Sequence, residues 1–420
     1  MTIIDLIYFQ NPWLRDSGYR PREQKLPQRA LYHTFLGHIT GTKQITSLTG
    51  IRRVGKSTLM KQAIAKLLDM GTTPERILYF SFDQPTVTHE IDALESVILT
   101  FFQHIVNKPI ETLEKTQYIF LDEIQLIPFW QDIVKRFYDV NQNLKFVLSG
   151  SSSLFLLTKS KESLAGRIFS FQLPPLTFNE YELLSRKHDI HEFLDYGQFP
   201  ELLTLPDPEK KQEYLKEIVS KVLEIDIVNI YGIRKMQEFE RLFWSLLPNA
   251  GQIISSQQLM ADIGIKKATL FHYLKILESS LLINKAVNTG GSFRSESRLL
   301  RKLYPGSSNF LTLSIDPIAI GFKVETYVSS LIHNYNKLSF YHKRNKEIDF
   351  ILPDKKLAIE VKYTDTIRPE DYRTLSEYSE KKGYTGILVT KSVNTKATKT
   401  IPTCISLDQL ETFMKNHLSP

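Results

Sequence analysis

Apolar residues follow two kinds of pattern along the first part of the chain. Short runs that are almost wholly apolar are typical of strands buried in a parallel sheet, and segments with apolar residues at helical spacing lie between them. The apolar runs predict strands at 44–49, 76–83, 118–123, 145–153 and 169–173. The helical spacing predicts helices at 29–38, 58–68, 89–106 and 129–140. This alternation predicts an α/β domain with a parallel sheet over residues 1–180, with an N-terminal extension up to about residue 43.

The pattern changes after residue 180. Residues 181–235 combine many charges with helical periodicity, which predicts a helical lid or linker packed on the first domain. Residues 236–305 predict a winged helix. Two of its helices, the second at 266–279, are joined by a tight turn at Gly264, and a strand at 282–287 leads into a polar wing.

Residues 306–420 return to strands and helices. An apolar helix is predicted at 322–332, and two alternating stretches, 347–352 and 357–362, flank a turn and predict a hairpin. Further strands are expected at 385–390 and 403–406. A second α/β domain is therefore expected after the winged helix.

A phosphate-binding loop follows the first strand. Residues 50–58 fit the pattern G-x-x-x-x-G-K-[ST], in which glycines let backbone N–H groups surround a phosphate. Lys56 would reach the β- and γ-phosphates, and the Ser57 hydroxyl would ligate Mg²⁺. Because a strand precedes the loop and a helix follows it, we expect a nucleotide site rather than a chance turn. The expected nucleotide-binding residues are Gly50, Arg53, Val54, Gly55, Lys56, Ser57, Thr58 and Ser151.

Two carboxylates end the strand at 118–123. Functional groups gather at the carboxyl ends of strands in a parallel sheet. We therefore expect Asp122 to hold Mg²⁺ and Glu123 to act as the general base for the attacking water. An exposed acidic strand end is the alternative, and the phosphate loop upstream favours the catalytic interpretation.

Other polar residues leave two interpretations open. Ser149 or Ser151 is expected to sense the γ-phosphate, and a serine-rich turn is the alternative. Arg167 is a candidate for stabilising charge on the transferred phosphoryl group, or for a structural salt bridge. Three arginines before the first core strand are interpreted as solvent-facing rather than as nucleotide contacts: Arg20, Arg22 and Arg29.

Several of these stretches occur together in a known family. They are the phosphate loop, 122–125, 149–152, 165–167, 173–181 and 196–201. Together they resemble a family of bacterial and archaeal P-loop ATPases of the AAA+/STAND group, whose members carry a winged helix and a nuclease-like C-terminal domain. The resemblance implies an ATPase core, a helical lid and accessory domains. It assigns the loop and the two carboxylates the roles given above, and places Arg167 at the family's Gly-Arg position.

A second candidate site lies in the C-terminal hairpin. Asp349 and Glu360 fall at matching ends of two paired strands, and Lys362 points to the same face as Glu360. Such carboxylates can hold a divalent cation that activates water, while the lysine orients that water or neutralises developing charge. Glu325, in the preceding helix, would complete the metal site. The pattern is similar to the D…E-x-K core of the PD-(D/E)xK nuclease superfamily, which implies a restriction-endonuclease-like fold. An ordinary charged hairpin is the alternative.

Composition narrows the class of protein. The 420 residues include one cysteine, which excludes an intrachain disulfide and a cysteine-based zinc site. No apolar run has the length of a membrane span, and the N-terminus does not resemble a secretory signal. We therefore expect a cytoplasmic protein with no membrane partner. The formal charge of +7 is compatible with nucleic acid, although a solvated basic surface gives the same charge.

These features predict a Mg²⁺-dependent ATPase that couples ATP binding and hydrolysis to DNA binding or processing. A nuclease that uses Mg²⁺ or Mn²⁺ is left open for the C-terminal domain. The alternative is an ATP-driven signalling or assembly switch whose nuclease-like domain binds without cutting. A homo-oligomer is compatible with both. The expected DNA contacts, on the outer face of the 266–279 helix, are Lys266, Lys267, Thr269, His272 and Lys275; the alternative there is a structural lid or a partner-docking role.

Overall fold

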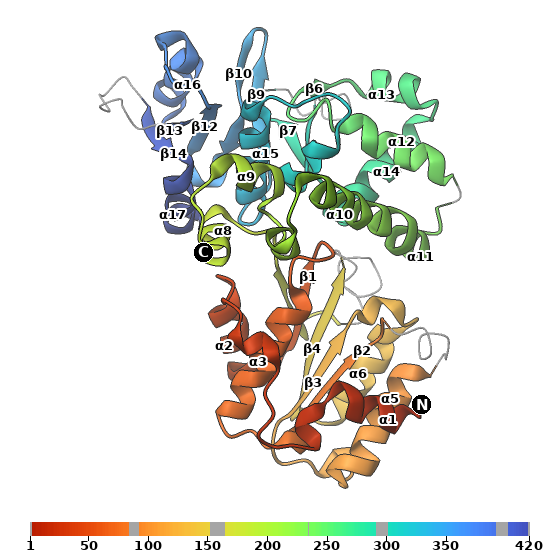
Figure 1. Cartoon of the computed structure of the whole chain (residues 1–420). Helices are drawn as coiled ribbons and strands as arrows, with labels where there is room; N and C mark the ends of the chain where they lie inside the picture. Colours follow the sequence, from red (N-terminus) through yellow and green to blue (C-terminus); the bar gives the residue numbers. More distant parts are fainter. Residues whose placement is uncertain are drawn as a thin grey trace. The chain divides into compact units, whose positions relative to one another are not determined.

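The structure, a computed structural model, describes residues 2–83, 92–151, 164–233, 235–290, 301–391 and 402–418. Contacts divide the chain into two compact units, Met1–Leu173 and Pro174–Pro420 (Figure 1). The first unit thus ends at Leu173 rather than at residue 180. None of the helices among these residues combines the length and the apolar character that a membrane crossing requires.

The first unit is built on a parallel sheet of five strands, as the sequence predicts. The strands lie in the order β2-β3-β4-β1-β5, so β4 separates β1 from β3. The positions of β1, β2 and β3 are almost all buried, because helices cover both faces of the sheet, whereas β5 at its edge is largely exposed. The strands are β1 (Ile45–Gly50), β2 (Ile77–Ser81), β3 (Gln117–Asp122), β4 (Leu144–Ser151) and β5 (Ile168–Gln172).

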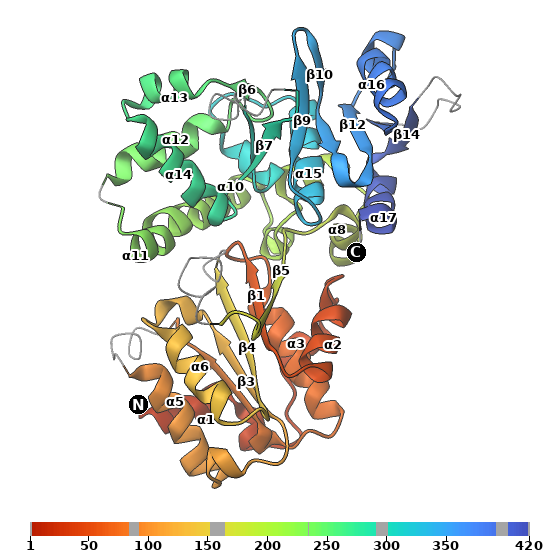
Figure 2. The same ribbon diagram turned by 180° about the vertical axis from the view of Figure 1, so that it is seen from behind.

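Helices form a layer on each face of this sheet, as both views show (Figure 1, Figure 2). One layer holds α2 (Tyr32–Gly41) and α3 (Lys56–Asp69). The other holds α1 (Ile3–Gln10), α5 (Ala93–Phe101) and α6 (Trp130–Val140), whose apolar sides share a core with the strands. The three-layer arrangement places the carboxyl ends of β1, β3 and β4 at one edge of the sheet.

The outer edge of β2 is closed by side chains of the N-terminal segment. The Asn11 side chain accepts a hydrogen bond from the Tyr79 N–H (2.6 Å) and donates one to the Tyr79 carbonyl (2.8 Å). Gln10 makes the same pair of bonds with Ser81, at 2.7 and 3.3 Å. Because an open sheet edge leaves backbone groups unpaired, these amides take the place of a further strand. The N-terminal extension is therefore part of the domain.

The second unit begins with helices that share a core with the C-terminal residues. Phe178, Tyr181 and Phe193 pack in one apolar cluster with Tyr327, and the Tyr327 hydroxyl accepts a hydrogen bond from the Phe178 N–H (2.9 Å). The sequence suggested a lid packed on the first domain; these helices are instead built into the core of the second unit. They are α8 (Phe178–Ser185) and α9 (Ile190–Tyr196), followed by α10 (Pro208–Lys221), the π-helical segment η9 (Val222–Ile227) and α11 (Val228–Tyr231).

The described residues between 236 and 305 form three helices and three short antiparallel strands. Gly264, with φ of 79°, makes the tight turn between the second and third helices, where a left-handed backbone favours glycine. The wing was expected at residues 282–291, of which Gly291 lies outside the described part of the chain. The elements are α12 (Met236–Leu246), β6 (Ile253–Ile254), α13 (Ser256–Ile263), α14 (Lys267–Ser279), β7 (Ile283–Asn288) and β8 (Arg301–Pro305).

This antiparallel set continues into the C-terminal residues. β7 pairs in parallel with β9 (Ser339–Lys343), and β9 pairs with β10 (Lys346–Ile348). One sheet of five strands results, in the order β10-β9-β7-β8-β6. The boundary expected at residue 305 therefore falls inside a continuous sheet, and the two segments form one body.

A four-stranded sheet completes the second unit, in the order β11-β12-β13-β14. One face packs on α15 and α17 through a cluster that includes Ile359 and Ile387, and the other packs on α16 through Leu375. The elements are β11 (Phe350–Leu352), β12 (Leu357–Lys362), β13 (Thr385–Thr390), β14 (Thr403–Ser406), α15 (Ile320–His333), α16 (Pro369–Lys382) and α17 (Leu407–Leu418).

Candidate functional site

The phosphate loop joins β1 to α3 and requires both of its glycines. A Cβ on Gly50 would lie 2.5 Å from the carbonyl oxygen of Leu173, so a side chain there would displace backbone. Gly55 has φ of 100° immediately before α3 begins. The first turn of α3 contains Ser57 and Thr58, whose backbone N–H groups have no partner within the helix. This turn therefore supplies donors for a phosphate.

Lys56 lies inside the curve of the loop. Its ammonium donates hydrogen bonds to the carbonyls of Gly50 (3.1 Å) and Ile51 (3.2 Å), and the residue is 4% exposed. Both partners are neutral, so the full positive charge of Lys56 is available to a phosphate that replaces them.

Arg29, which precedes α2 in the chain, stabilises the phosphate loop through a hydrogen bond. Its guanidinium donates to the Val54 carbonyl at 2.7 Å, and the residue is 7% exposed. The expectation of a solvent-facing side chain was therefore wrong for Arg29, because its partner is a loop carbonyl that residue spacing does not reveal. Arg20 pairs with Asp69 (2.6 Å), while the Arg22 side chain is 92% exposed.

Asp122 ends β3 beside the end of β4. It is 2% exposed and accepts hydrogen bonds from the Tyr79 hydroxyl (2.8 Å) and from the Ser149 hydroxyl. Both hydroxyls are neutral donors, so they leave the carboxylate its negative charge. Carboxylate and hydroxyl oxygens are ligands that Mg²⁺ prefers, and the residues present fit the expected ion, with Asp122 and Ser57 to hold it. Bound there, Mg²⁺ would neutralise charge on the phosphates.

Tyr79 is a site residue that was not predicted from the sequence. It lies on β2, is 5% exposed, and both burial and the nearby Asp122 carboxylate raise the pKa of its hydroxyl. The hydroxyl therefore stays protonated and can only donate to Asp122. A tyrosine within an otherwise aliphatic and aromatic buried strand was the available signal, because a buried hydroxyl needs a partner.

Glu123 follows Asp122 in a left-handed backbone conformation, with φ of 54°. Burial and the neighbouring Asp122 raise the pKa of its carboxyl, while Lys56 and Arg52 act in the opposite direction. Gln125 donates a hydrogen bond to one of its oxygens. A carboxylate with a raised pKa beside the phosphate loop has the properties of a general base.

Two candidate serines, Ser149 and Ser151, lie at the end of β4. Ser149 contacts Asp122 directly, so its hydroxyl lies at the edge of the sheet where the phosphate loop begins. The side chain of Ser151 lies outside the described part of the structure. Arg53, also expected at the nucleotide, is an exposed loop residue with φ of 69°.

Arg167 lies at the opposite edge of the sheet from the phosphate loop. It immediately precedes β5, and its carbonyl accepts a hydrogen bond (2.8 Å) from Ile45, the first residue of β1. Its guanidinium pairs with Asp139, with 2.9 Å from Nε to Oδ1. The length of β1, roughly 3.3 Å per residue, separates it from Gly50. The structure therefore shows the structural salt bridge, and Arg167 does not lie at the phosphate loop of its own chain.

The C-terminal hairpin brings its predicted residues together. Phe350 pairs with Ile359, so Asp349 and Glu360 lie opposite each other at the next position. The Asp349 N–H donates to Glu360 (3.3 Å), and the Val361 N–H donates to Asp349 (3.0 Å). The Lys362 ammonium lies 2.8 Å from a Glu360 oxygen, on the expected face.

The centre of this cluster is occupied by a lysine that was not predicted as a site residue. The Lys302 ammonium lies 3.0 Å from Glu325, 2.7 Å from Glu347 and 2.8 Å from Asp349. Lys302 belongs to β8 and is 2% exposed. The Tyr304 hydroxyl, also on β8, donates to Glu325 at 2.7 Å. No local signal indicated this, because the lysine and the carboxylates come from separate elements.

The expected divalent cation does not fit this arrangement. An ammonium already stands between the carboxylates that were expected to share the metal, and Glu360 is paired with Lys362 instead. Across the described residues, no three His, Cys, Asp or Glu side chains are grouped as a metal site requires. The metal site of Glu325, Asp349 and Glu360 expected from the sequence is therefore corrected to an ion-paired cluster.

The protonation of the cluster agrees with this. Burial, followed by the charge of Asp349, raises the pKa of Glu325 and of Glu360 to about 8. Burial also acts to raise the pKa of Asp349, but the two lysine ammoniums hold it below its usual value. Glu325 and Glu360 therefore keep their protons to a higher pH than an ordinary glutamate does, whereas Asp349 loses its proton more easily than an ordinary aspartate.

The outer face of α14 is exposed and basic, as expected. Lys266, Lys267, His272 and Lys275 are exposed, whereas the inward positions, Leu270 among them, are buried. On the same module, the Arg301 guanidinium lies over the Phe271 ring at 4.5 Å. A row of exposed cationic side chains on a helix suits phosphate contacts.

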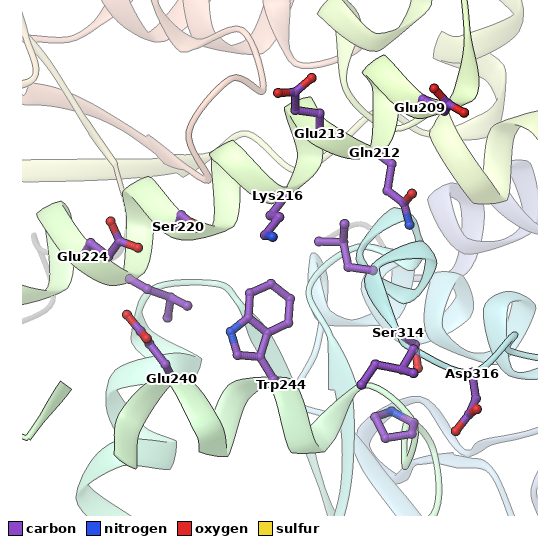
Figure 3. A pocket seen from close by; sticks show the side chains of 14 residues that line it. Glu209, Gln212, Glu213, Lys216, Ser220, Glu224, Glu240, Trp244, Ser314 and Asp316 are labelled. Carbon is purple, nitrogen blue, oxygen red and sulfur yellow. The ribbon is translucent and has the colours of Figure 1, made fainter. Parts of the chain in front are cut away.

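A groove of about 940 Å³ lies elsewhere in the second unit, between α10, α12 and residues 313–316 (Figure 3). The Trp244 ring projects into it from α12 towards Lys216 of α10. Five carboxylates line it against one lysine, so it repels a phosphate backbone. The carboxylates are Glu209, Glu213, Glu224, Glu240 and Asp316.

Comparison with known proteins supports the nucleotide site. Residues 42–182 match the AAA_14 family, described as an AAA domain. Residues 187–305 and 320–410 each match a domain of unknown function, DUF8612 and DUF4143. An uncharacterized protein of Haemophilus influenzae is 27% identical over 258 residues, which is 58% of this chain and 62% of that protein.

Two further similarities extend over more of the chain. An uncharacterized protein of Methanocaldococcus jannaschii is 26% identical over 353 residues, which is 76% of this chain and 75% of that protein. The solved structure of a Walker-type ATPase of Pyrococcus abyssi is 16% identical and covers 71% of this chain and 99% of its own, with a TM-score of 0.47. The AAA match and the phosphate loop on a parallel sheet make the first unit a P-loop ATPase domain of AAA+ type.

Proposed function

We propose that this chain is a Mg²⁺-dependent ATPase that couples ATP binding and hydrolysis to DNA binding. The observation that carries the ATPase part is that Lys56, Asp122 and Glu123 meet at the carboxyl edge of one sheet, each in a state suited to its role. Lys56 is buried among neutral carbonyls, Asp122 accepts hydrogen bonds from neutral hydroxyls, and Glu123 has a raised pKa.

In this proposal the loop and the first turn of α3 hold the phosphates of ATP. Lys56 attracts the β- and γ-phosphates, and Ser57 and Asp122 hold Mg²⁺. Glu123 accepts a proton from the attacking water. Because Arg167 pairs with Asp139 at the far edge of the sheet, an arginine that stabilises the transferred phosphoryl group would come from elsewhere, for instance from a second copy of the chain.

The DNA part rests on the module of α12, α13 and α14 with β6, β7 and β8, which we interpret as a winged helix. Its third helix has an apolar inner face and an exposed outer face with Lys267, His272 and Lys275. A recognition helix in the major groove presents its side chains in this way. The acidic groove around Trp244 is excluded as the DNA face by its charge.

The test is fluorescence anisotropy of labelled duplex DNA with the full chain, with and without ATP and Mg²⁺. Replacing Lys267 and Lys275 together by Glu should weaken binding by at least tenfold and lower its salt dependence, because two phosphate contacts are lost. The matched control reverses two exposed lysines away from α14, Lys216→Glu with Lys355→Glu. Equal weakening by both pairs, or DNA affinity that ATP does not change, would count against the proposal.

A second candidate function is an ATP-driven switch whose C-terminal domain binds without cutting. The Lys302 ammonium among the carboxylates favours it over a Mg²⁺- or Mn²⁺-dependent nuclease at Asp349, Glu360 and Lys362. Incubation with linear, branched and single-stranded DNA in each metal tests this directly. Cleavage by the wild type that Lys362→Ala abolishes, with ATP hydrolysis intact, would restore the nuclease.

A further inference from the structure

Lys302 has the surroundings of a bound ion rather than of an ordinary lysine. Its ammonium has three N–H donors, and three carboxylates lie within 3.0 Å of it. The side chain is 2% exposed, and the partners Glu325 and Asp349 are each about one-tenth exposed. Each donor therefore has a carboxyl oxygen as acceptor, and no donor is left for solvent or substrate.

We infer that Lys302 is a built-in cation of this cluster and takes the position that a divalent metal would otherwise occupy. The carboxylates of Glu325, Glu347 and Asp349 converge on its Nζ from α15, from β10 and from the residue between β10 and β11. A metal held by the same oxygens would meet the ammonium at its own site, where the charges repel. Without a bound metal the cluster cannot activate a water molecule, and it therefore cannot hydrolyse a phosphodiester by the metal-dependent mechanism.

The strand that carries Lys302 shows what the cluster does instead. β8 is a strand of the α12–α14 module, whereas Glu325 and Asp349 belong to the C-terminal domain. The ion pairs therefore fasten the DNA-binding candidate to the nuclease-like fold, next to the point where β7 and β9 join the two in one sheet. A charge left behind by separation would be buried and unpaired, which is strongly unfavourable.

A glycine of the α12–α14 module packs against the Lys302 cluster. Gly251 donates its N–H to the Leu303 carbonyl (3.0 Å), and a Cβ on it would lie 3.2 Å from Glu325 Oε1. Backbone thus covers Glu325 at close range. The carboxylates that would face a scissile phosphate in a nuclease are here covered by protein, which is consistent with a fastening role.

Metal binding by the full chain is the first test, with Mn²⁺ measured by its electron paramagnetic resonance signal in the absence of nucleotide. The parent protein and every variant derived from it carry Asp122→Asn, so that the ATPase site binds less Mn²⁺. We expect no Mn²⁺ binding that depends on Asp349 in this parent. If adding Asp349→Asn lowers Mn²⁺ affinity tenfold or more, the inference is overturned, because the cluster then takes a metal despite Lys302.

Thermal unfolding tests the role of Lys302 itself. Lys302→Met keeps the side-chain length and removes the charge, and it should lower the unfolding midpoint by several degrees. Adding Asp349→Asn and Glu325→Gln should recover at least half of that loss, because the unpaired charges are gone. Lys346→Met, which removes an exposed lysine paired with Glu377, is the matched control and should shift the midpoint little.

The recovery keeps the test decisive even if Lys302→Met alone fails to fold. A combined variant that folds supports the built-in cation, and a combined variant no more stable than Lys302→Met overturns it. Neither readout involves ATP hydrolysis or DNA. A failure of the proposed ATPase and DNA function would therefore be seen separately from a failure of this inference.

Discussion

Both units place a buried lysine near a group of acidic residues, but the two lysines face different partners. In the ATPase domain, Lys56 donates to backbone carbonyls, and Asp122 accepts only neutral hydroxyl and amide donors among its described hydrogen bonds. In the C-terminal domain, Lys302 donates to the carboxylates themselves. The first site keeps its charges separate, and the second neutralises them.

The partner of each charge decides whether the same residue types form a reactive site or a structural one. Charges held apart by neutral partners remain available to a ligand that brings opposite charges, such as MgATP. Charges paired with each other in a buried cluster have already exchanged water for a protein partner, and a ligand must break that pairing. Motifs record the residue types but not the partner of each charge.

The largest effects should come from removing each lysine in turn. Lys56→Met should lower kcat/KM for ATP by roughly a thousandfold, about 4 kcal/mol of transition-state stabilisation, while the unfolding midpoint changes little. Lys302→Met should do the reverse, since it leaves buried carboxylates unpaired at a cost of about 3–5 kcal/mol of stability. Steady-state ATP hydrolysis and urea unfolding of both variants measure this. Loss of hydrolysis in both, or of stability in both, would erase the contrast between the sites.

A smaller effect on turnover is expected from Glu123→Gln. The amide keeps the shape but cannot accept the proton of the attacking water, so kcat should fall by about 10²–10³-fold. Binding of a fluorescent ATP analogue should stay within a factor of about three. Glu111→Gln, at an exposed carboxylate of the same domain, is the control. Undiminished hydrolysis would refute Glu123 as the base.

The sequence predicts most of the helices and strands, but it does not predict most of the difference between the two lysine sites. The strand expected at 118–123 is Gln117–Asp122, and the helix expected at 322–332 lies within Ile320–His333. Both signals are local: a buried parallel strand is a continuous apolar run, and a helix has its own period. The phosphate loop and the hairpin of Asp349 and Glu360 were predictable for the same reason.

What was missed depends on contacts between distant residues. The pairing of β7 with β9 joins Val287 to Ser339 and removes the boundary expected at 305, and no periodicity within either strand indicates it. Lys302 meets Asp349 and Glu325 only once that sheet forms. Arg29 reaches the Val54 carbonyl in the same way. The sequence therefore located the chemical groups, while the pairing of their charges needed the fold.

The pH dependence of stability should separate the two sites further. Glu325 and Glu360 have folded pKa values raised to about 8 from 4.5, so the folded state binds more protons than the unfolded state between these pH values. Their contribution is full below about pH 4.5 and is lost as pH rises through about 8. Urea unfolding from pH 5 to 9 should show stability falling as the pH rises, by several kcal/mol.

The control for this slope is the variant with Glu325→Gln and Glu360→Gln, which has no carboxyl to titrate at either position. Lys145, in the ATPase domain, has a pKa lowered to about 7 by burial and contributes the opposite slope above pH 7. The comparison of wild type and variant cancels that contribution. If the slope is the same in both, burial does not raise the pKa of Glu325 and Glu360 as inferred.

The smallest effect tests whether Asp122 is held by neutral donors. Tyr79→Phe removes the hydroxyl that donates to Asp122 at 2.8 Å and keeps the buried ring in place. The free energy of unfolding should fall by about 1.5 kcal/mol, the usual value for one hydrogen bond to a charged group. Tyr118→Phe, on the neighbouring strand β3, removes a tyrosine hydroxyl at the other end of the sheet and should cost less. Because Ser149 and the Glu123 N–H still donate to Asp122, ATP hydrolysis should fall only severalfold. A collapse of hydrolysis as large as that of Lys56→Met would mean that Tyr79 acts on the nucleotide itself, and the ATPase site would then depend on a hydroxyl that here serves only to orient its metal ligand.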